Sequence, residues 1–109
     1  MTAADRLPAA FARMVEATNA GDSAAFLASF APDAVIDDWG REFTGHEAIA
    51  GWDARENIGV HAHIAVEQVT RGGQVYTATI SVSGDGYNGG GTFAAEIRDD
   101  LIARLTIRG

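Results

Sequence analysis

The chain has 109 residues, of which 47% are hydrophobic, and its 15 acidic and 8 basic residues give a formal net charge of −7. This length suits one hydrophobic core and is too short for two, so we expect a single domain over residues 1–109. The negative charge would repel a nucleic acid, and no apolar stretch approaches the roughly 20 residues needed to cross a membrane. With no cysteine and no signal-peptide pattern at its start, the sequence predicts a cytoplasmic protein without nucleic-acid or membrane partners.

Apolar side chains at helical spacing predict a first helix over residues 3–20. Its apolar stripe comprises Leu7, Phe11, Met14 and Val15. Gly21 suits a left-handed helix end and Asp22 suits the cap of a following helix, so a second helix is expected to begin there. This second helix is short, includes Phe30 and ends at Pro32.

A β-branched pattern then predicts a short strand over residues 34–38, followed by a turn at residues 39–41. The sequence from Thr44 to Glu47 matches a capping box, in which each of the two side chains bonds the other's backbone amide. A third helix is therefore expected to begin here and to end near Gly59.

Beyond this helix, apolar and polar residues alternate as they do in half-buried strands. The alternation predicts strands over residues 60–67, 75–83, 93–97 and 101–107, and the glycine-rich segment 84–91 is expected to be a mobile loop. We summarise the order as two helices, a short strand, a third helix and three long strands (α-α-β-α-β-β-β). The expected fold is an α+β meander whose helices cover one face of a mostly antiparallel sheet.

This order resembles that of the SnoaL-like branch of the nuclear transport factor 2-like superfamily. The matching segments are residues 19–22, 30–38, 43–49 and 101–105. The resemblance implies a cone-shaped, curved sheet with three helices on its concave face, a pocket for a small hydrophobic ligand, and a homodimer formed through the sheet. The superfamily includes ketosteroid isomerases, polyketide cyclases, dehydratases, epoxide hydrolases and non-catalytic binding domains, so the fold does not select one function.

The resemblance places Asp38 at the position of the catalytic aspartate of steroid isomerases. Beside Trp39 at an apolar pocket mouth, lost hydration would favour a neutral carboxyl, which suits a general base. The alternative is an exposed acid that pairs with Arg41 or caps the turn. The same alignment places Met14 at the isomerases' tyrosine donor, and Phe93 or Ala94 near their second donor, so that side-chain oxyanion hole is missing.

His61 and His63 are two residues apart on a predicted strand, so their side chains share one face. With one carboxylate they would make a metal pair or an acid/base site, and the resemblance places His61 roughly where some SnoaL-like dehydratases have a pocket histidine. Ile64 and its apolar neighbours are better core candidates, which favours an orientation that turns both histidines outward. We keep His61 as a catalytic candidate and predict no metal site.

Several large side chains suit an aromatic cavity for a flat ligand, although core packing explains them equally well. The predicted ligand-binding residues are Met14, Trp39, Trp52, Tyr76 and Phe93. Two functions follow: a cofactor-free isomerase, cyclase or dehydratase that acts on a hydrophobic carbonyl compound through Asp38, or a non-catalytic ligand-binding or dimerisation domain. The first requires Asp38 to be buried beside empty volume. The polar sheet surface at Thr77, Thr79 and Ser81 suits a homodimer or another protein partner.

Overall fold

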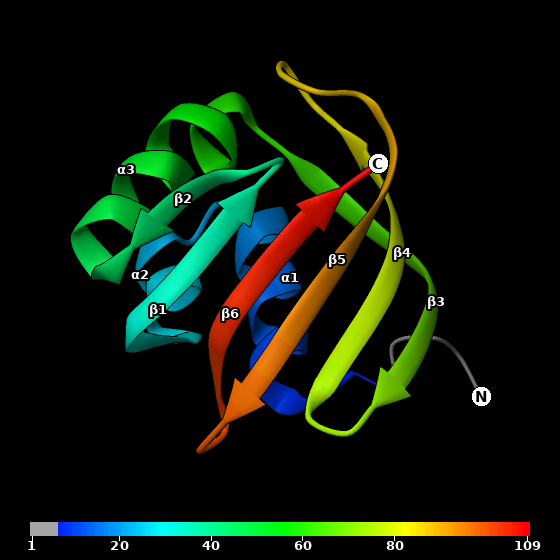
Figure 1. Ribbon diagram of the computed structural model, residues 1–109. Coiled ribbons are helices and arrows are strands. Elements are labelled where there is room, and N and C mark those ends of the chain that lie inside the picture. The colour runs from blue at the N-terminus through cyan, green and yellow to red at the C-terminus, as the bar shows by residue number, and fades with distance from the viewer. Residues whose placement is uncertain (1–6) are drawn as a thin grey trace.

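The computed structural model describes residues 7–109, which form three α-helices, one short 3₁₀ helix and six strands (Figure 1). In chain order these are α1 (Ala9–Ala20), α2 (Ser23–Ala28), β1 (Phe30–Asp38), β2 (Arg41–Thr44), α3 (Gly45–Glu56), η2 (Ile58–Val60), β3 (His63–Gly72), β4 (Val75–Ser83), β5 (Gly89–Arg98) and β6 (Leu101–Arg108). Within residues 7–109, no helix has the length and hydropathy needed to cross a membrane.

The strands form a single mixed sheet in the order β2-β1-β6-β5-β4-β3. The pairing of β1 with β6 is parallel, and the other four pairings are antiparallel. The expectation of an α+β fold with a mostly antiparallel sheet is therefore confirmed. The four strands predicted after the third helix are present as β3, β4, β5 and β6, so the summary order with three long strands was one strand short. The strand β2 was missed.

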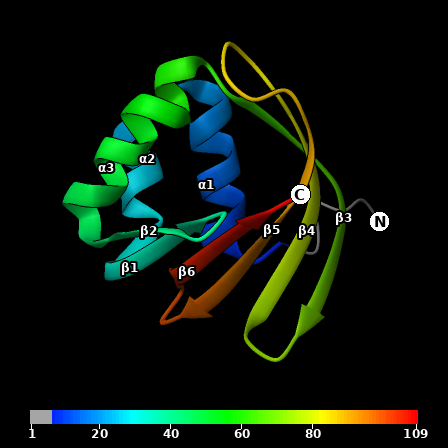
Figure 2. The ribbon, with the colours of Figure 1, turned by 45° about the horizontal axis from the view of Figure 1, so that its top comes forward.

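The three helices cover one face of the curved sheet (Figure 2). The apolar stripe of α1 lies in the core, where Phe11 and Met14 are fully buried. The predicted start of this helix at residues 3–6 lies outside the described residues, and within them the helix begins at Ala9, after Pro8. Proline has no amide hydrogen to donate, so it suits a position at a helix start.

The junction between the first two helices was predicted correctly. Gly21 takes the left-handed conformation with φ of 72°, and the Asp22 side chain accepts a hydrogen bond from the Ala25 amide at 3.0 Å. The end of α2 was wrong, because Phe30 already belongs to β1. The Ile102 amide donates to Ser29 O at 2.9 Å, so pairing with β6 draws the chain out of the helix before Pro32.

The capping box was also wrong. Thr44 precedes α3, but its side chain makes no capping hydrogen bond. Thr44 is instead the last residue of β2 and pairs with Val35 of β1. Pairing with β1 holds this residue in the sheet, and Gly45, with φ of 85°, redirects the chain into the helix.

The strand predicted to begin at residue 60 begins instead at His63, because Ile58–Val60 form η2. The side chains have the predicted orientation, with Ala62 and Ile64 buried and His61 and His63 exposed. The register of β3 shifts between Val66 and Gln68, and such a bulge moves the following side chains to the other face.

Candidate functional site

A cavity of about 350 Å³ lies between α3, η2 and the inner face of the sheet. Its apolar wall consists of Ile64, Ile80, Val82, Phe93 and Ile107. Asp38 lies at its edge, at the end of β1, where it pairs in register with Ile107 of β6 and Arg41 of β2. A cavity of this size, largely apolar with few polar groups, is typical of a small-molecule site.

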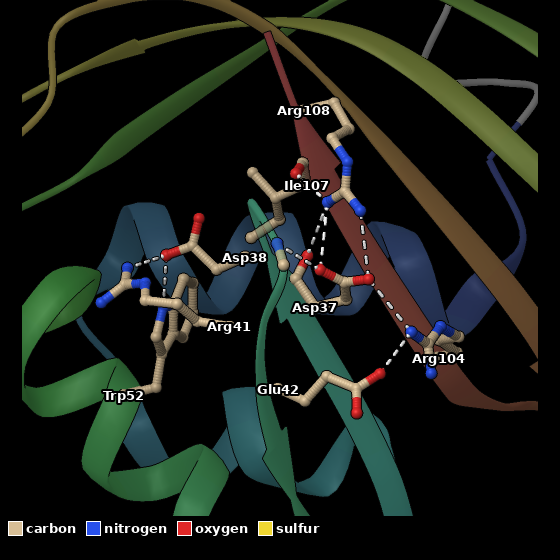
Figure 3. Close-up of polar contacts among 9 residues, drawn as sticks. Asp37, Asp38, Arg41, Glu42, Trp52, Arg104, Ile107 and Arg108 are labelled. Carbon is tan, nitrogen blue, oxygen red and sulfur yellow. Dashed lines mark hydrogen bonds and ion pairs between the residues drawn. The ribbon is translucent and has the colours of Figure 1, made fainter.

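Asp38 is held by two hydrogen bonds to a single oxygen (Figure 3). Trp52 Nε1 of α3 donates to Asp38 Oδ2 at 3.1 Å, and Arg41 Nη2 donates to the same oxygen. The residue is only 9% exposed, so it is buried beside empty volume, as the enzyme reading requires. It also pairs with Arg41, as the alternative reading expected. The two donors fix the orientation of the carboxylate.

The second carboxylate oxygen of Asp38 is free to meet a ligand. Among residues 7–109 no group donates a hydrogen bond to Oδ1, and no buried side-chain oxygen or nitrogen is left without a partner. Oδ1 is therefore not sealed in the core but open to solvent or to the cavity. One oxygen of Asp38 therefore accepts two hydrogen bonds, and the other accepts none from the described residues.

Arg41 connects Asp38 to the end of α3. Its guanidinium donates to both oxygens of Glu56, at 2.7 and 3.0 Å, as well as to Asp38. The hydrogen bonds to Glu56, followed by attraction to Asp38 and Glu56, raise the pKa of Arg41 above its usual range. Arg41 therefore stays positively charged and shares that charge between two carboxylates.

The sequence also matches a known domain family. The model of the SnoaL-like domain matches residues 11–105 of the sequence. The chain belongs to the SnoaL-like domain family. The resemblance to the nuclear transport factor 2-like superfamily seen in the sequence is thereby confirmed.

Solved structures support the same fold for this SnoaL-like domain. A candidate polyketide cyclase from Sinorhizobium meliloti is 29% identical, with a TM-score of 0.88 over 96% of this chain and 98% of that one. The Δ5-3-ketosteroid isomerase of a Mycobacterium species is 19% identical, with a TM-score of 0.80 over 93% and 90% of the two chains. A Mycobacterium tuberculosis protein in complex with estradiol-17β-hemisuccinate is 17% identical, with a TM-score of 0.79 over 90% and 88%. Comparison with functionally curated proteins gave no significant match.

The SnoaL-like domain brings some of the predicted site residues together and not others. Trp39, Trp52 and Phe93 line the cavity together with Asp38. Met14 is fully buried in the core, and half-buried Tyr76 packs beside Arg71, with the guanidinium 5.2 Å from the ring centroid. Neither is among the described residues that line the cavity, because α1 and this part of β4 face the packed core instead.

His61 lies outside the cavity. Its side chain is 80% exposed, and its Nδ1 lies 2.7 Å from Asp85 Oδ2 in the loop between β4 and β5. His61 and His63 thus take the outward orientation that the sequence favoured. The loop predicted over residues 84–91 is shorter in the structure, because Gly89 already belongs to β5. Within the loop, the Asn88 side chain accepts from the Gly84 amide and donates to Gly84 O and Gly86 O.

Sequence reasoning missed two parts of this site. Glu56 and Arg55 line the cavity, but nothing in their local sequence distinguishes them from other acids and bases on an exposed helix face. The hydrogen bond from Trp52 to Asp38 was also missed. The alternation that turns Ile64 and its neighbours inward could have indicated the cavity wall, because residues predicted to lie in the core line the cavity.

Asp37 has a structural role on the opposite side of β1 from Asp38 (Figure 3). Arg108 donates to both of its oxygens at 3.1 Å, Arg104 donates at 3.1 Å, and the Gly40 amide donates at 2.8 Å. Led by the Arg108 hydrogen bond, these donors lower the pKa of Asp37 to about 2. The network joins β1, β6 and the turn that presents Asp38.

Asp37→Asn is expected to lower the melting temperature by roughly 5 °C at neutral pH. The depressed pKa of Asp37 means that its ionised form stabilises the folded state above the ordinary value of 3.8, and that this stability is lost as the pH falls towards about 2. The difference between wild type and variant should therefore be constant above about pH 5 and shrink towards pH 2. Thermal melts followed by circular dichroism measure it, and a pH-independent difference would contradict the assignment.

A third buried acid, Asp53, lies behind the cavity wall. It is 2% exposed, and the side chain of cavity-lining Asn57 donates to it at 2.9 Å and to Thr18 at 3.1 Å. Burial raises the pKa of Asp53 above its ordinary value of 3.8 despite these contacts. Its ionised form is therefore a cost to the folded state.

For Asp53→Asn, the stability difference from wild type should depend on pH in the opposite direction to that for Asp37→Asn. The folded state holds the Asp53 proton more tightly than the unfolded state, so wild-type stability falls as the pH rises upward from 3.8, by about 1.4 kcal/mol for each unit of pKa difference. The asparagine variant keeps a side-chain oxygen that accepts from Asn57, but its stability should not fall in this way as the pH rises. Urea unfolding from pH 3 to 7 measures the difference, and parallel curves for the two proteins would show that Asp53 does not titrate differently on folding.

Proposed function

We propose that this SnoaL-like domain binds a hydrophobic, carbonyl-bearing small molecule in the cavity, and that Asp38 moves a proton on it without a cofactor. The observation that carries the proposal is a carboxylate with one oxygen anchored by Trp52 and Arg41 and the other open. Such anchoring fixes the direction in which the free oxygen can accept a proton. The reaction class is isomerisation, cyclisation or dehydration.

The proposed step is proton abstraction from the carbon next to the carbonyl group. Asp38 Oδ1 takes the proton, the electron pair of the broken C–H bond forms an enolate, and return of the proton to another carbon completes an isomerisation. The enolate oxygen requires a donor. The steroid-isomerase donors are absent at Met14 and Phe93, as the sequence indicated.

One other group remains to stabilise that oxygen. Most polar side chains of the cavity wall are engaged, with Tyr87 bonded to Gly90 O and Asn57 bonded to Asp53. Among residues 7–109, the Arg55 guanidinium lines the cavity without a hydrogen bond to another residue. We assign the donor role to Arg55.

Similar proteins support a flat hydrophobic ligand. One is the Mycobacterium tuberculosis protein with bound estradiol-17β-hemisuccinate, and another is a computationally designed binder of 17-OHP, with a TM-score of 0.81 at 18% identity. The alternative function is a non-catalytic binding domain. It is favoured by the ion pair of Asp38 with Arg41, because a carboxylate used to hold a guanidinium can be purely structural.

The assembly we propose is a cytoplasmic homodimer formed through the outer face of the sheet. Thr79 is exposed there, opposite Thr92 of β5, and Thr77 and Ser81 are half-buried on the same face. Small polar side chains let two sheets approach closely. Sedimentation equilibrium tests the dimer, and a monomer at all concentrations would refute it.

The first experiment uses 2-tetralone, a bicyclic ketone with exchangeable protons next to its carbonyl group. In D₂O the wild-type protein should exchange these protons faster than buffer does, as followed by proton NMR. Binding without exchange, detected by tryptophan fluorescence, would favour the non-catalytic alternative. If the protein neither binds 2-tetralone nor exchanges its protons, the proposed carbonyl-ligand site is refuted.

A further inference from the structure

Two exposed aromatic side chains lie at the cavity. In residues 7–109 the exposed large hydrophobic residues are Trp39 at 66%, Tyr87 at 64% and Val75 at 37%. The two aromatic residues line the cavity and Val75 does not. Single exposed apolar residues are common on proteins, but two at one cavity indicate a surface that a ligand covers.

The aromatic residues come from different turns at the same end of the sheet, Trp39 from the β1–β2 turn and Tyr87 from the β4–β5 loop (Figure 1). Both turns are fixed. The Trp39 amide donates to Ile107 O at 3.2 Å, and the neighbouring Gly40 amide donates to Asp37. Tyr87 donates from its hydroxyl to Gly90 O at 2.7 Å.

The loop that carries Tyr87 also bonds to the segment between α3 and β3. The Asp85 amide donates to Val60 O at 2.8 Å, and the Asp85 carboxylate contacts His61. A Cβ added at Gly89 would lie 2.8 Å from the Tyr87 hydroxyl oxygen, so the ring lies close over the backbone there. The backbone at Trp39 and the side chain of Tyr87 are thus held in place, and groups held in place lose less freedom when they contact a ligand, which favours binding.

The charge of the cavity limits the kind of ligand. Asp38 and Glu56 are balanced by Arg41 and Arg55, and Arg108 is paired with Asp37. No net negative charge remains to attract an ammonium group to the aromatic rings. The cavity volume of about 350 Å³ is near the lower end for drug-sized ligands, so a ligand of that size would extend to the mouth.

We infer that Trp39 and Tyr87 form an aromatic rim that stacks on the outer ring of an elongated, uncharged, planar ligand whose inner end lies near Asp38. This inference rests on the proposed ligand cavity and adds to it the shape of the ligand and two residues that select it. The rim discriminates ligands by length, because a short ligand bound near Asp38 does not reach the two rings.

The test uses 2-naphthol and the longer 6-phenyl-2-naphthol as probes. The chain has two tryptophans, Trp39 and Trp52, so 5-fluorotryptophan labelling gives two fluorine resonances, assigned with Trp39→Phe. Both probes should shift the Trp52 resonance, and only the longer probe should shift that of Trp39. If the longer probe shifts the Trp52 resonance alone, the aromatic rim is refuted but the proposed ligand cavity is not. If neither probe shifts the Trp52 resonance, both the rim and the ligand cavity are refuted.

Rim variants give an independent measurement. Trp39→Ala and Tyr87→Ala should each weaken binding of the longer probe by about 2- to 10-fold and leave the affinity for 2-naphthol unchanged. Val75→Ala, the third exposed hydrophobic residue, is the matched control and should affect neither probe. Equal losses for both probes, or measurable binding of tetramethylammonium that these variants abolish, would overturn the inferred ligand class. Melting curves check that each variant is folded.

Discussion

Asp38→Asn is expected to slow proton exchange from bound 2-tetralone by about 10²- to 10⁴-fold. Asparagine has nearly the same size and keeps an oxygen to accept from Trp52 and Arg41, but it does not take up a proton at neutral pH. The loss should therefore fall on the exchange rate, with ligand affinity little changed. Exchange is followed by proton NMR and affinity by fluorescence titration.

Asp33→Asn is the matched control for this prediction. Asp33 is another acid of β1, with a side chain that is 72% exposed, and it pairs with Arg98 away from the cavity. An exposed pair of this kind contributes little to stability, so wild-type exchange is expected. Equal rates for Asp38→Asn and wild type would exclude Asp38 as the base. Equal losses in both variants would point to overall charge instead.

Gly59→Ala is expected to destabilise the fold by about 3 to 5 kcal/mol. Gly59 lies in η2, directly after α3, and a Cβ there would lie 1.6 Å from Ala54 O. The obstacle is backbone rather than a movable side chain, so η2 would have to separate from the end of α3. That movement would also disturb Asn57 and Val60, which line the cavity.

Urea unfolding measures this effect, with Gly72→Ala as the control. Gly72 ends β3, and a Cβ there would have no atom within 4 Å, so the substitution should change the free energy of unfolding by no more than about 0.5 kcal/mol. Similar stabilities for the two variants would contradict the close packing of η2 against α3.

Some of the site follows from local sequence patterns. The alternation around Ile64 predicted which side chains face inward and that His61 has neighbours better suited to the core. The strand ending in Asp38 and the turn at Trp39 were predicted from β-branched residues and glycine. The family resemblance, carried by segments spread over the chain, was confirmed by the match over residues 11–105.

The errors lie where a long-range contact competes with a local signal. Phe30 follows a helix and is apolar, but its pairing with Ile102 places it in a strand. Thr44 and Glu47 have the spacing of a capping box, but pairing with Val35 holds Thr44 in β2. A hydrogen bond between strands is invisible to any pattern read within a few residues.

The sequence by itself determined the α+β class, the helix break at Gly21 and the faces of the long strands, because each depends on residue spacing or on one residue's backbone preference. Only the tertiary structure decided that Asp38 is anchored by Trp52 and Arg41, and that Arg41 is shared with Glu56. These residues meet because α3 packs across the end of β1. That placement depends on the pairing of the whole sheet, and no short segment of the chain specifies it.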